Sequence, residues 1–458
     1  MTILCSVEGG NSEAMIRCPV MAQTLLTSGD PTGAAVRSRL THSDLPVSDE
    51  CPNGGRSIRI CSEVSQSGTG NHKSKQQAVA RKCKSGSETQ ASPRMKELLE
   101  GLNEPGDSGN PPEAPLWLDR ELFNRGRQFY QRYLFCVFFS DLLALLMMFS
   151  VSRILRPLIY TGRSDTPLRA LRRYVSTIMH VITWYSGDVW DPSDRAHRDI
   201  LTVRSIHNNS ARTFNSSAHH EELGTLDVRD KGHEEPRCPF NPTIRQDLAS
   251  QVRPNIVLES PENPPVYISQ WDMLLTQFSF VGLIVAHPSR MGAWWVSEKE
   301  LAGLVHFWRG IGFLLGIEDK YNFCNGTVEE TRALCMEMEH LVIKPRIAEV
   351  DWSYEHMSSS LMEGISHMIP AVSYPAMFRF LADTLAISLP NFVSRMSLLH
   401  TFQYWLIRFI FHVVFLVPGF VLLFNELLKT ALNIVQDQNP RWFPKSRTQV
   451  TVTPYIYT

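Results

Sequence analysis

The chain has 458 residues, 43% of them hydrophobic, and a formal net charge of −1. This composition is ordinary for a globular protein long enough for two or three domains. The near-neutral charge gives no electrostatic case for a nucleic-acid partner. The nine cysteines are odd in number and irregularly spaced, which argues against a disulfide framework.

The N-terminal part of the chain has an unusual composition, because its first aromatic residue is Trp117. A long segment rich in serine, glycine and charge cannot easily bury enough apolar surface to offset the entropy of ordering. We therefore predict that residues 1–112 form a disordered, low-complexity tail, in which residues 93–100 are a candidate short helix. Met1 is followed by no long apolar segment, so no secretory signal peptide is visible.

Residues 134–151 form an apolar run interrupted by Ser140, Asp141 and Ser150. The run is almost long enough to cross a bilayer. A carboxylate at its centre would cost about 3 kcal/mol in lipid. We therefore favour a buried helix that lines the core or an apolar channel, with a membrane span as the alternative.

A helix is predicted over residues 168–185. Its positions Arg173, Thr177 and His180 are spaced i, i+4 and i+7 and therefore share one face. A cation, a hydroxyl and an imidazole on an inward face suggest a site. On spacing alone, however, an amphipathic core helix with locally satisfied polar groups is favoured.

A second helix is predicted over residues 194–208, with Ser193 or Asp194 as its N-cap. The apolar positions Ile200 and Val203 are followed at the same spacing by His207. This pattern places an imidazole on the apolar side of the helix.

The remaining sequence up to Leu389 is also predicted to be mostly helical. Residues 211–262 are the exception, since they are polar with little periodicity, and we predict a disordered insertion there. Helical spacing returns at 266–287, and capping-box sequences at 297–300 and 327–330 begin two further helices. Alternating apolar and polar residues are nearly absent, so the expected fold class is all-α, a helical bundle.

The most apolar C-terminal stretch is Phe409–Phe424, in which His412 is the only strongly polar residue. A bilayer span needs about 20 apolar residues. A short span, a monotopic hairpin at Pro418 and a closing core helix therefore all remain open. We predict a hydrophobic, membrane-associated helix over 401–436, followed by a basic tail over 437–458.

Several of these segments together resemble a known family. Arg-Tyr-Val-Ser-Thr at 173–177, followed by Arg-Ser-Ile-His at 204–207, resembles the signature of the latex-clearing protein (rubber oxygenase) family. That family includes fungal MpaB-type oxygenases bound to the endoplasmic reticulum. The likeness continues in three further segments, residues 160–164, 268–277 and 308–317.

The resemblance implies a catalytic domain over residues 113–400 with a globin-like core that binds haem b through one histidine. His207 is then the iron ligand, with Arg173 and Thr177 beside the haem as cofactor-binding and catalytic residues; His180 is the rival ligand. The implied reaction is cleavage of an isoprenoid double bond by dioxygen. The implied partners are a lipophilic small-molecule substrate, dioxygen and membrane lipid, and the implied location is the endoplasmic reticulum.

The chain departs from the family pattern at two places. Ser176 stands where the family has a lysine, and no glutamate lies between Glu121 and Glu221 to act as the family's catalytic base. Asp141 and Asp165 are candidate substitutes. The alternative function is therefore a non-catalytic haem- or lipid-binding membrane protein that retains the fold. A third hypothesis is a structural membrane protein in which the second-helix histidine is only a core residue.

Overall fold

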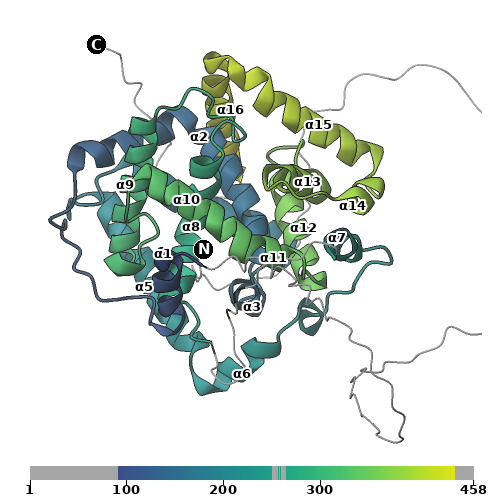
Figure 1. Ribbon diagram of the computed structural model, residues 1–458, viewed down its shortest axis with the longest axis horizontal. Helices are drawn as coiled ribbons and strands as arrows, with labels where there is room; N and C mark the ends of the chain where they lie inside the picture. Colours follow the sequence, from purple (N-terminus) through teal and green to yellow (C-terminus); the bar gives the residue numbers. More distant parts are fainter. Residues whose placement is uncertain (1–90, 250–255, 257, 259–264, 439–458) are drawn as a thin grey trace, which may run out of the picture. The chain divides into compact units, whose positions relative to one another are not determined.

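The computed structural model describes residues 91–249, 256, 258 and 265–438. Every regular element in these ranges is a helix, and the one strand-like pairing there is an isolated bridge between Pro105 and Ser269. The prediction of an all-α fold is therefore confirmed (Figure 1).

The α-helices are α1 (Pro93–Glu100), α2 (Arg120–Phe149), α3 (Ser152–Tyr160), α4 (Pro167–Ser186), α5 (Arg195–Phe214), α6 (Ser217–Thr225), α7 (Asn241–Leu248), α8 (Gln270–Ala286), α9 (Glu298–Leu314), α10 (Val328–Met338), α11 (Lys344–Ile347), α12 (Trp352–Ser366), α13 (Tyr374–Thr384), α14 (Pro390–Ser394), α15 (Leu398–His412) and α16 (Pro418–Gln438). Short 3₁₀ turns are η1 (Gly101–Asn103), η2 (Val228–Lys231), η3 (Asp319–Tyr321) and η5 (Val414–Leu416), and η4 (Glu339–Ile343) is a π-helical turn.

Local sequence signals set several helix ends. Capping boxes begin α9 at Ser297 and α10 at Thr327, as predicted. Of the two candidate caps of α5, Asp194 is the one whose side chain accepts from the first turn. After α9, Gly316 has a φ of +99°, a left-handed conformation that favours glycine and ends the helix.

Helix α2 is the central element and contacts α8, α9 and α16. Its apolar window is 83% buried, so the apolar run at 134–151 is a core helix, as favoured from the sequence. The close approach of α2 to α9 depends on two glycines. A Cβ atom at Gly126 would lie 2.3 Å from the carbonyl oxygen of Gly303.

A kink in α2 connects it to the C-terminal helices. The backbone of Tyr133 is non-helical (φ −118°, ψ 27°), so nearby backbone groups lack their helical partners. The buried side chain of Asn425 on α16 supplies them. Its amide oxygen accepts from the N–H of Phe135 at 2.8 Å, and its nitrogen donates to the carbonyls of Gln131 (3.2 Å) and Arg132 (2.9 Å). One amide thus fastens α16 to the central helix.

The predicted boundary of the N-terminal tail is wrong, because residues 91–112 pack onto the helical body. Helix α1 coincides with the short helix expected there, and its Met95 and Leu98 are fully buried. Farther along, Asp107 forms an ion pair with Arg204 of α5. Aliphatic anchors and one ion pair order this segment without aromatic residues. The rest of the predicted tail lies outside the described residues.

The predicted disordered insertion at 211–262 is also wrong over residues 211–249. Helix α5 continues to its end at Phe214, and α6, η2 and α7 follow. The segment is fixed by isolated buried anchors, Phe214, Leu223, Val228, Ile244 and Leu248. Apart from Ile244 and Leu248, which are four residues apart on α7, these anchors are too widely spaced to form a helical stripe, so periodicity gave only a weak signal.

The single hydrophobic helix predicted over 401–436 is instead two helices, α15 and α16, joined through η5 and drawn in yellow tones in Figure 1. Pro418 begins α16, a position where its missing N–H costs no helical hydrogen bond. We call residues 398–438 the C-terminal hairpin. Helix α2, the segment Leu398–Leu416 (α15 together with η5) and helix α16 are long and apolar enough to cross a membrane by length and composition. Most of the predicted basic tail lies outside the described residues.

Candidate functional site

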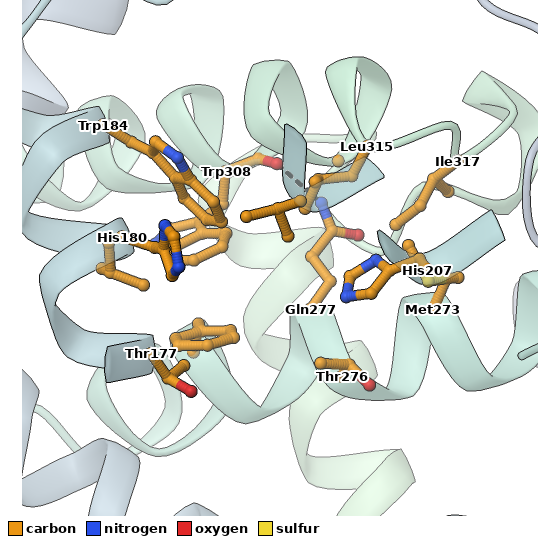
Figure 2. A pocket seen from close by; sticks show the side chains of 14 residues that line it. Thr177, His180, Trp184, His207, Met273, Thr276, Gln277, Trp308, Leu315 and Ile317 are labelled. Atoms are coloured by element: carbon orange, nitrogen blue, oxygen red, sulfur yellow. Dashed lines mark hydrogen bonds between the residues drawn. The ribbon is translucent and has the colours of Figure 1, made fainter. Parts of the chain in front are cut away.

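A cavity with about 470 Å³ of empty space, its opening included, is lined by residues of α4, α5, α8 and α9 and of the turn after α9. We call it the histidine cavity, because it contains His180 and His207 (Figure 2). Its walls are mainly apolar and include Val181, Val203, Met273, Phe280, Leu315 and Ile317. Thr177 also lines it, so two of the three predicted site residues, Thr177 and His207, share one cavity.

The two histidines reach the cavity from different helices. His180 lies with Trp184 on one side and His207 lies with Met273 on the other (Figure 2). Both side chains are buried. Their convergence follows from the packing of α4 against α5, which the sequence alone did not establish.

Asp199 of α5 orients the imidazole of His180. The Nδ1 atom of His180 lies 2.9 Å from both carboxylate oxygens of Asp199, which also accepts from the indole N–H of Trp184 at 2.9 Å. A carboxylate on one imidazole nitrogen favours the tautomer whose lone pair is on the other. Sequence reasoning missed Asp199. The only available signal was its position beside Ile200, on the edge of the apolar stripe of α5.

Arg173 lies in an adjoining cavity of about 320 Å³, which we call the arginine cavity; it shares Thr276 with the histidine cavity. The guanidinium is buried, and its Nη1 donates to the hydroxyls of Thr161 (3.3 Å) and Ser164 (3.4 Å). Its Nε and Nη2 atoms are buried without a hydrogen-bond partner among the described residues. Burial lowers the pKa of Arg173. A buried cation with unpaired donors is costly by itself and would be stabilised by an anion.

A third cavity, of about 570 Å³, shares Thr177, Val181 and Phe280 with the histidine cavity. We call it the aspartate cavity, because Asp141 lies on its wall. One carboxyl oxygen of Asp141, Oδ1, is buried without a hydrogen-bond partner in the described part of the chain. Burial raises the pKa of Asp141 well above its ordinary value.

Asp165 and Ser176, the other two positions considered where the sequence departs from the family pattern, lie outside these three cavities. Asp165 contacts Arg169 at 3.1 Å and His233 at 3.3 Å. Ser176 is only partly buried. Neither lines the histidine, arginine or aspartate cavity, and no lysine or glutamate is among the described residues that do. Of the two candidate carboxylates, Asp141 is therefore the one near the site.

Comparisons with known proteins give little further information. No family model matches the sequence, and no curated protein matches it. Among solved structures, a latex clearing protein in its closed state is similar with a TM-score of 0.46 and 15% identity, over 74% of this chain and 84% of that chain. A similarity at this TM-score and identity carries no further conclusion about this chain. It does not reveal a cofactor or a substrate, and it does not support the MpaB-type branch of the resemblance.

Proposed function

We propose that this chain is a haem-b-dependent, membrane-associated oxygenase that cleaves a lipophilic, isoprenoid chain with dioxygen. One observation carries the proposal. His207 and Thr177 line one apolar cavity, and the buried guanidinium of Arg173 lies in the adjoining one, with two nitrogens that have no partner among the described residues.

The residues present fit the chemistry of haem, which is a flat apolar ring with an iron and two carboxylates. We assign His207 to the iron, and Arg173 to a propionate through charge-assisted hydrogen bonds. The apolar walls formed by Val203, Met273 and Leu315 suit the ring. When bound, the haem supplies the activation of dioxygen.

The chain's own residues then orient the substrate and exclude water. Thr177 lies where the histidine and aspartate cavities meet, and its hydroxyl donates to the carbonyl of Arg173 at 3.2 Å. Phe280 lines both cavities with it. An apolar chain in the aspartate cavity would therefore extend past these two side chains toward the histidines.

Membrane association is supported by the outer face of the C-terminal hairpin. Of the 17 exposed large hydrophobic side chains among the described residues, 13 belong to this hairpin. They include Leu398, Phe402, Trp405 and Phe409 on one face of α15, and Phe420, Leu423 and Leu427 on α16. An apolar surface of this extent is typical of a protein-binding or membrane-binding face.

The inner face of the hairpin is held by polar contacts to the body. Gln403 accepts from the hydroxyl of Ser373 at 2.7 Å and donates to the carbonyl of Pro370 at 3.0 Å. The indole of Trp294 donates to the carbonyl of Phe411 at 2.8 Å. Because only the outer face is available to lipid, we propose that the hairpin lies in the membrane interface and does not cross the bilayer. A location at the endoplasmic reticulum stays a prediction from the resemblance.

The test is product formation by the full chain purified with its haem. Incubated with squalene as the isoprenoid, it should yield fragments with carbonyl ends under air and none under argon. The His207→Ala variant, prepared in parallel, should form no product. Haem-loaded protein that forms no product with squalene or with shorter isoprenoids would contradict the oxygenase proposal.

A second candidate function is a non-catalytic haem- or lipid-binding protein. It is favoured by the absence of lysine and glutamate from the described walls of the three cavities. The same incubation separates the two functions, because this candidate retains a haem spectrum and gives no product at any oxygen concentration.

A further inference from the structure

The polar groups of the aspartate cavity differ in whether they already have partners. The hydroxyl of Thr177 donates to the carbonyl of Arg173 at 3.2 Å, and that of Ser279 donates to the carbonyl of Thr276 at 2.6 Å. Oδ1 of Asp141 and the phenolic oxygen of Tyr174 are buried and have no hydrogen-bond partner among the described residues. Tyr174 also lines the arginine cavity, whereas Asp141 lines the aspartate cavity and not the arginine cavity. Buried polar atoms in proteins nearly always have a partner. The carboxyl group therefore marks the place where a bound molecule would supply a donor.

The surroundings of Asp141 favour an uncharged donor. Burial favours the neutral acid, and apolar walls make a buried ammonium ion costly. The arginine cavity shares Leu145, Tyr174 and Ser279 with the aspartate cavity, so the cation of Arg173 would repel an ammonium group nearby. An anionic head group would instead be attracted to Arg173. A hydroxyl group is uncharged, so it avoids the cost of burying a charge and is neither repelled by nor drawn to Arg173.

The rest of the cavity is suited to a hydrocarbon chain. Phe138 and Leu142 of α2 and Ile178 of α4 supply apolar wall. At the other end, Thr177 and Phe280 are shared with the histidine cavity. A chain anchored at Asp141 would therefore direct its carbons, and not its polar end, toward the histidines.

We propose that the aspartate cavity binds a lipophilic alcohol whose hydroxyl group donates to Asp141 and whose chain extends toward Thr177. This inference deepens the proposed function, on which it rests, by naming the substrate class and its orientation. Asp141 is then the specificity-determining residue that selects an alcohol over the corresponding hydrocarbon or amine.

The experiment measures binding to the full chain, in one detergent, of three ligands with the same carbon skeleton: farnesol, farnesylamine and the hydrocarbon lacking the head group. Quenching of intrinsic fluorescence reports occupancy, independently of turnover. Farnesol should bind about tenfold tighter than either analogue, as expected for a hydrogen bond that satisfies a buried group. Asp141→Leu should abolish this preference while hydrocarbon binding remains.

Ser140→Ala is the matched control, because Ser140 is a buried neighbour on the same helix that does not line the cavity. It should retain the tenfold preference. Equal binding of alcohol and hydrocarbon by the wild type, tighter binding of the amine, or a preference that survives Asp141→Leu would each overturn the inference. The absorption spectrum of the same samples separates the two proposals. Protein without haem that still prefers farnesol contradicts only the oxygenase function, and haem-loaded protein without the preference contradicts only this inference.

Discussion

The C-terminal hairpin and the three internal cavities differ in which of their groups lack a suitable partner: apolar groups in the hairpin and polar groups in the cavities. In the hairpin, the buried amides of Gln403 and Asn425 have protein partners, and most of the exposed large side chains on one face are apolar. In the cavities the walls are apolar, while Arg173 and Asp141 retain buried polar atoms without partners among the described residues. The exposed face of the hairpin therefore lacks an apolar surface to pack against. Buried polar atoms of Arg173 and Asp141 lack hydrogen-bonding groups among the described residues.

This difference between the hairpin and the cavities indicates that the protein binds two kinds of ligand, one at its apolar surface and one inside its cavities. Exposed apolar area is stabilised by lipid through the hydrophobic effect. A buried cation and a partly buried carboxyl with one buried oxygen need specific groups, an anion for one and a donor for the other. An enzyme that takes a lipophilic substrate from a membrane to an internal cofactor would need both features.

The largest expected effect concerns the amide that joins the two regions. Asn425→Ala should reduce the free energy of unfolding by about 3–4 kcal/mol, because one buried N–H group and two partly buried carbonyl groups at the α2 kink lose their partner. Urea unfolding in detergent measures this loss. Asn433→Ala, at an exposed position on the same helix, should change stability by less than about 0.5 kcal/mol. Equal effects of the two variants would show that the kink is stabilised in another way.

The next largest effect concerns the outer face of the hairpin. Replacing Phe402, Trp405 and Phe409 with serine should weaken binding to phospholipid vesicles by about 100-fold, since roughly 3 kcal/mol of apolar burial is lost. Vesicle flotation measures the bound fraction. Serine at Leu116 and Met336, which are exposed but lie outside the hairpin, should leave binding unchanged. Unchanged flotation of the triple variant would exclude this face as the membrane contact.

A smaller effect is expected at the buried cation. Arg173→Ala should weaken haem retention about 10- to 100-fold, because a charge-assisted hydrogen bond contributes roughly 1.5–3 kcal/mol. Transfer of haem to apomyoglobin measures the loss, and circular dichroism should show unchanged helix content. Arg169→Ala is the control, since Arg169 is mostly exposed and pairs with Asp165 outside the cavities. Equal retention by both variants would remove Arg173 from the haem site.

The last effect, the smallest over any one pH unit, concerns the pH dependence of stability at Asp141. Burial raises the pKa of this carboxyl above 3.8 in the folded state, so the folded protein retains a proton that the unfolded chain releases. Wild-type stability should therefore fall relative to Asp141→Asn as the pH rises from about 5, by up to about 1.4 kcal/mol per pH unit. Urea unfolding of both proteins at several pH values between 5 and 8 provides the comparison. A difference that does not change with pH would show that Asp141 is not buried as an acid.

The fold could be predicted from the sequence where helix formation is determined by neighbouring residues, through periodicity and capping. Helical periodicity and caps place α4 close to its predicted bounds, fix the start of α5 and begin α9 and α10 at Ser297 and Thr327. The end of α5 was not predicted, because the helix continues past residue 208 to Phe214. The order of residues 91–112 and 211–249 was not predictable in this way. It depends on a few buried side chains such as Leu98 and Leu223, whose partners are distant in sequence.

The candidate site was predictable in part for the same reason. The helical spacing predicted that Thr177 and His207 lie on inward faces of their helices. In the structure both line one cavity. The contact of Asp199 with His180 depends on how α4 packs against α5. The environment of Asp141, whose Oδ1 has no partner among the described residues, depends on how α2 packs against its neighbours. Contacts between different helices produce no regular residue spacing that could be recognised in a single sequence. The identity of the iron ligand therefore stays a prediction, and His180, with its carboxylate partner, is the alternative.

The most direct test is the absorption spectrum of three haem-loaded full chains: wild type, His207→Ala and His180→Ala. We expect a Soret band in the wild type and in His180→Ala, and its loss in His207→Ala with helix content unchanged. That result would assign the iron to His207. A normal Soret band in His207→Ala with loss in His180→Ala would contradict the ligand assignment. A wild-type protein that never binds haem would contradict the proposed function itself.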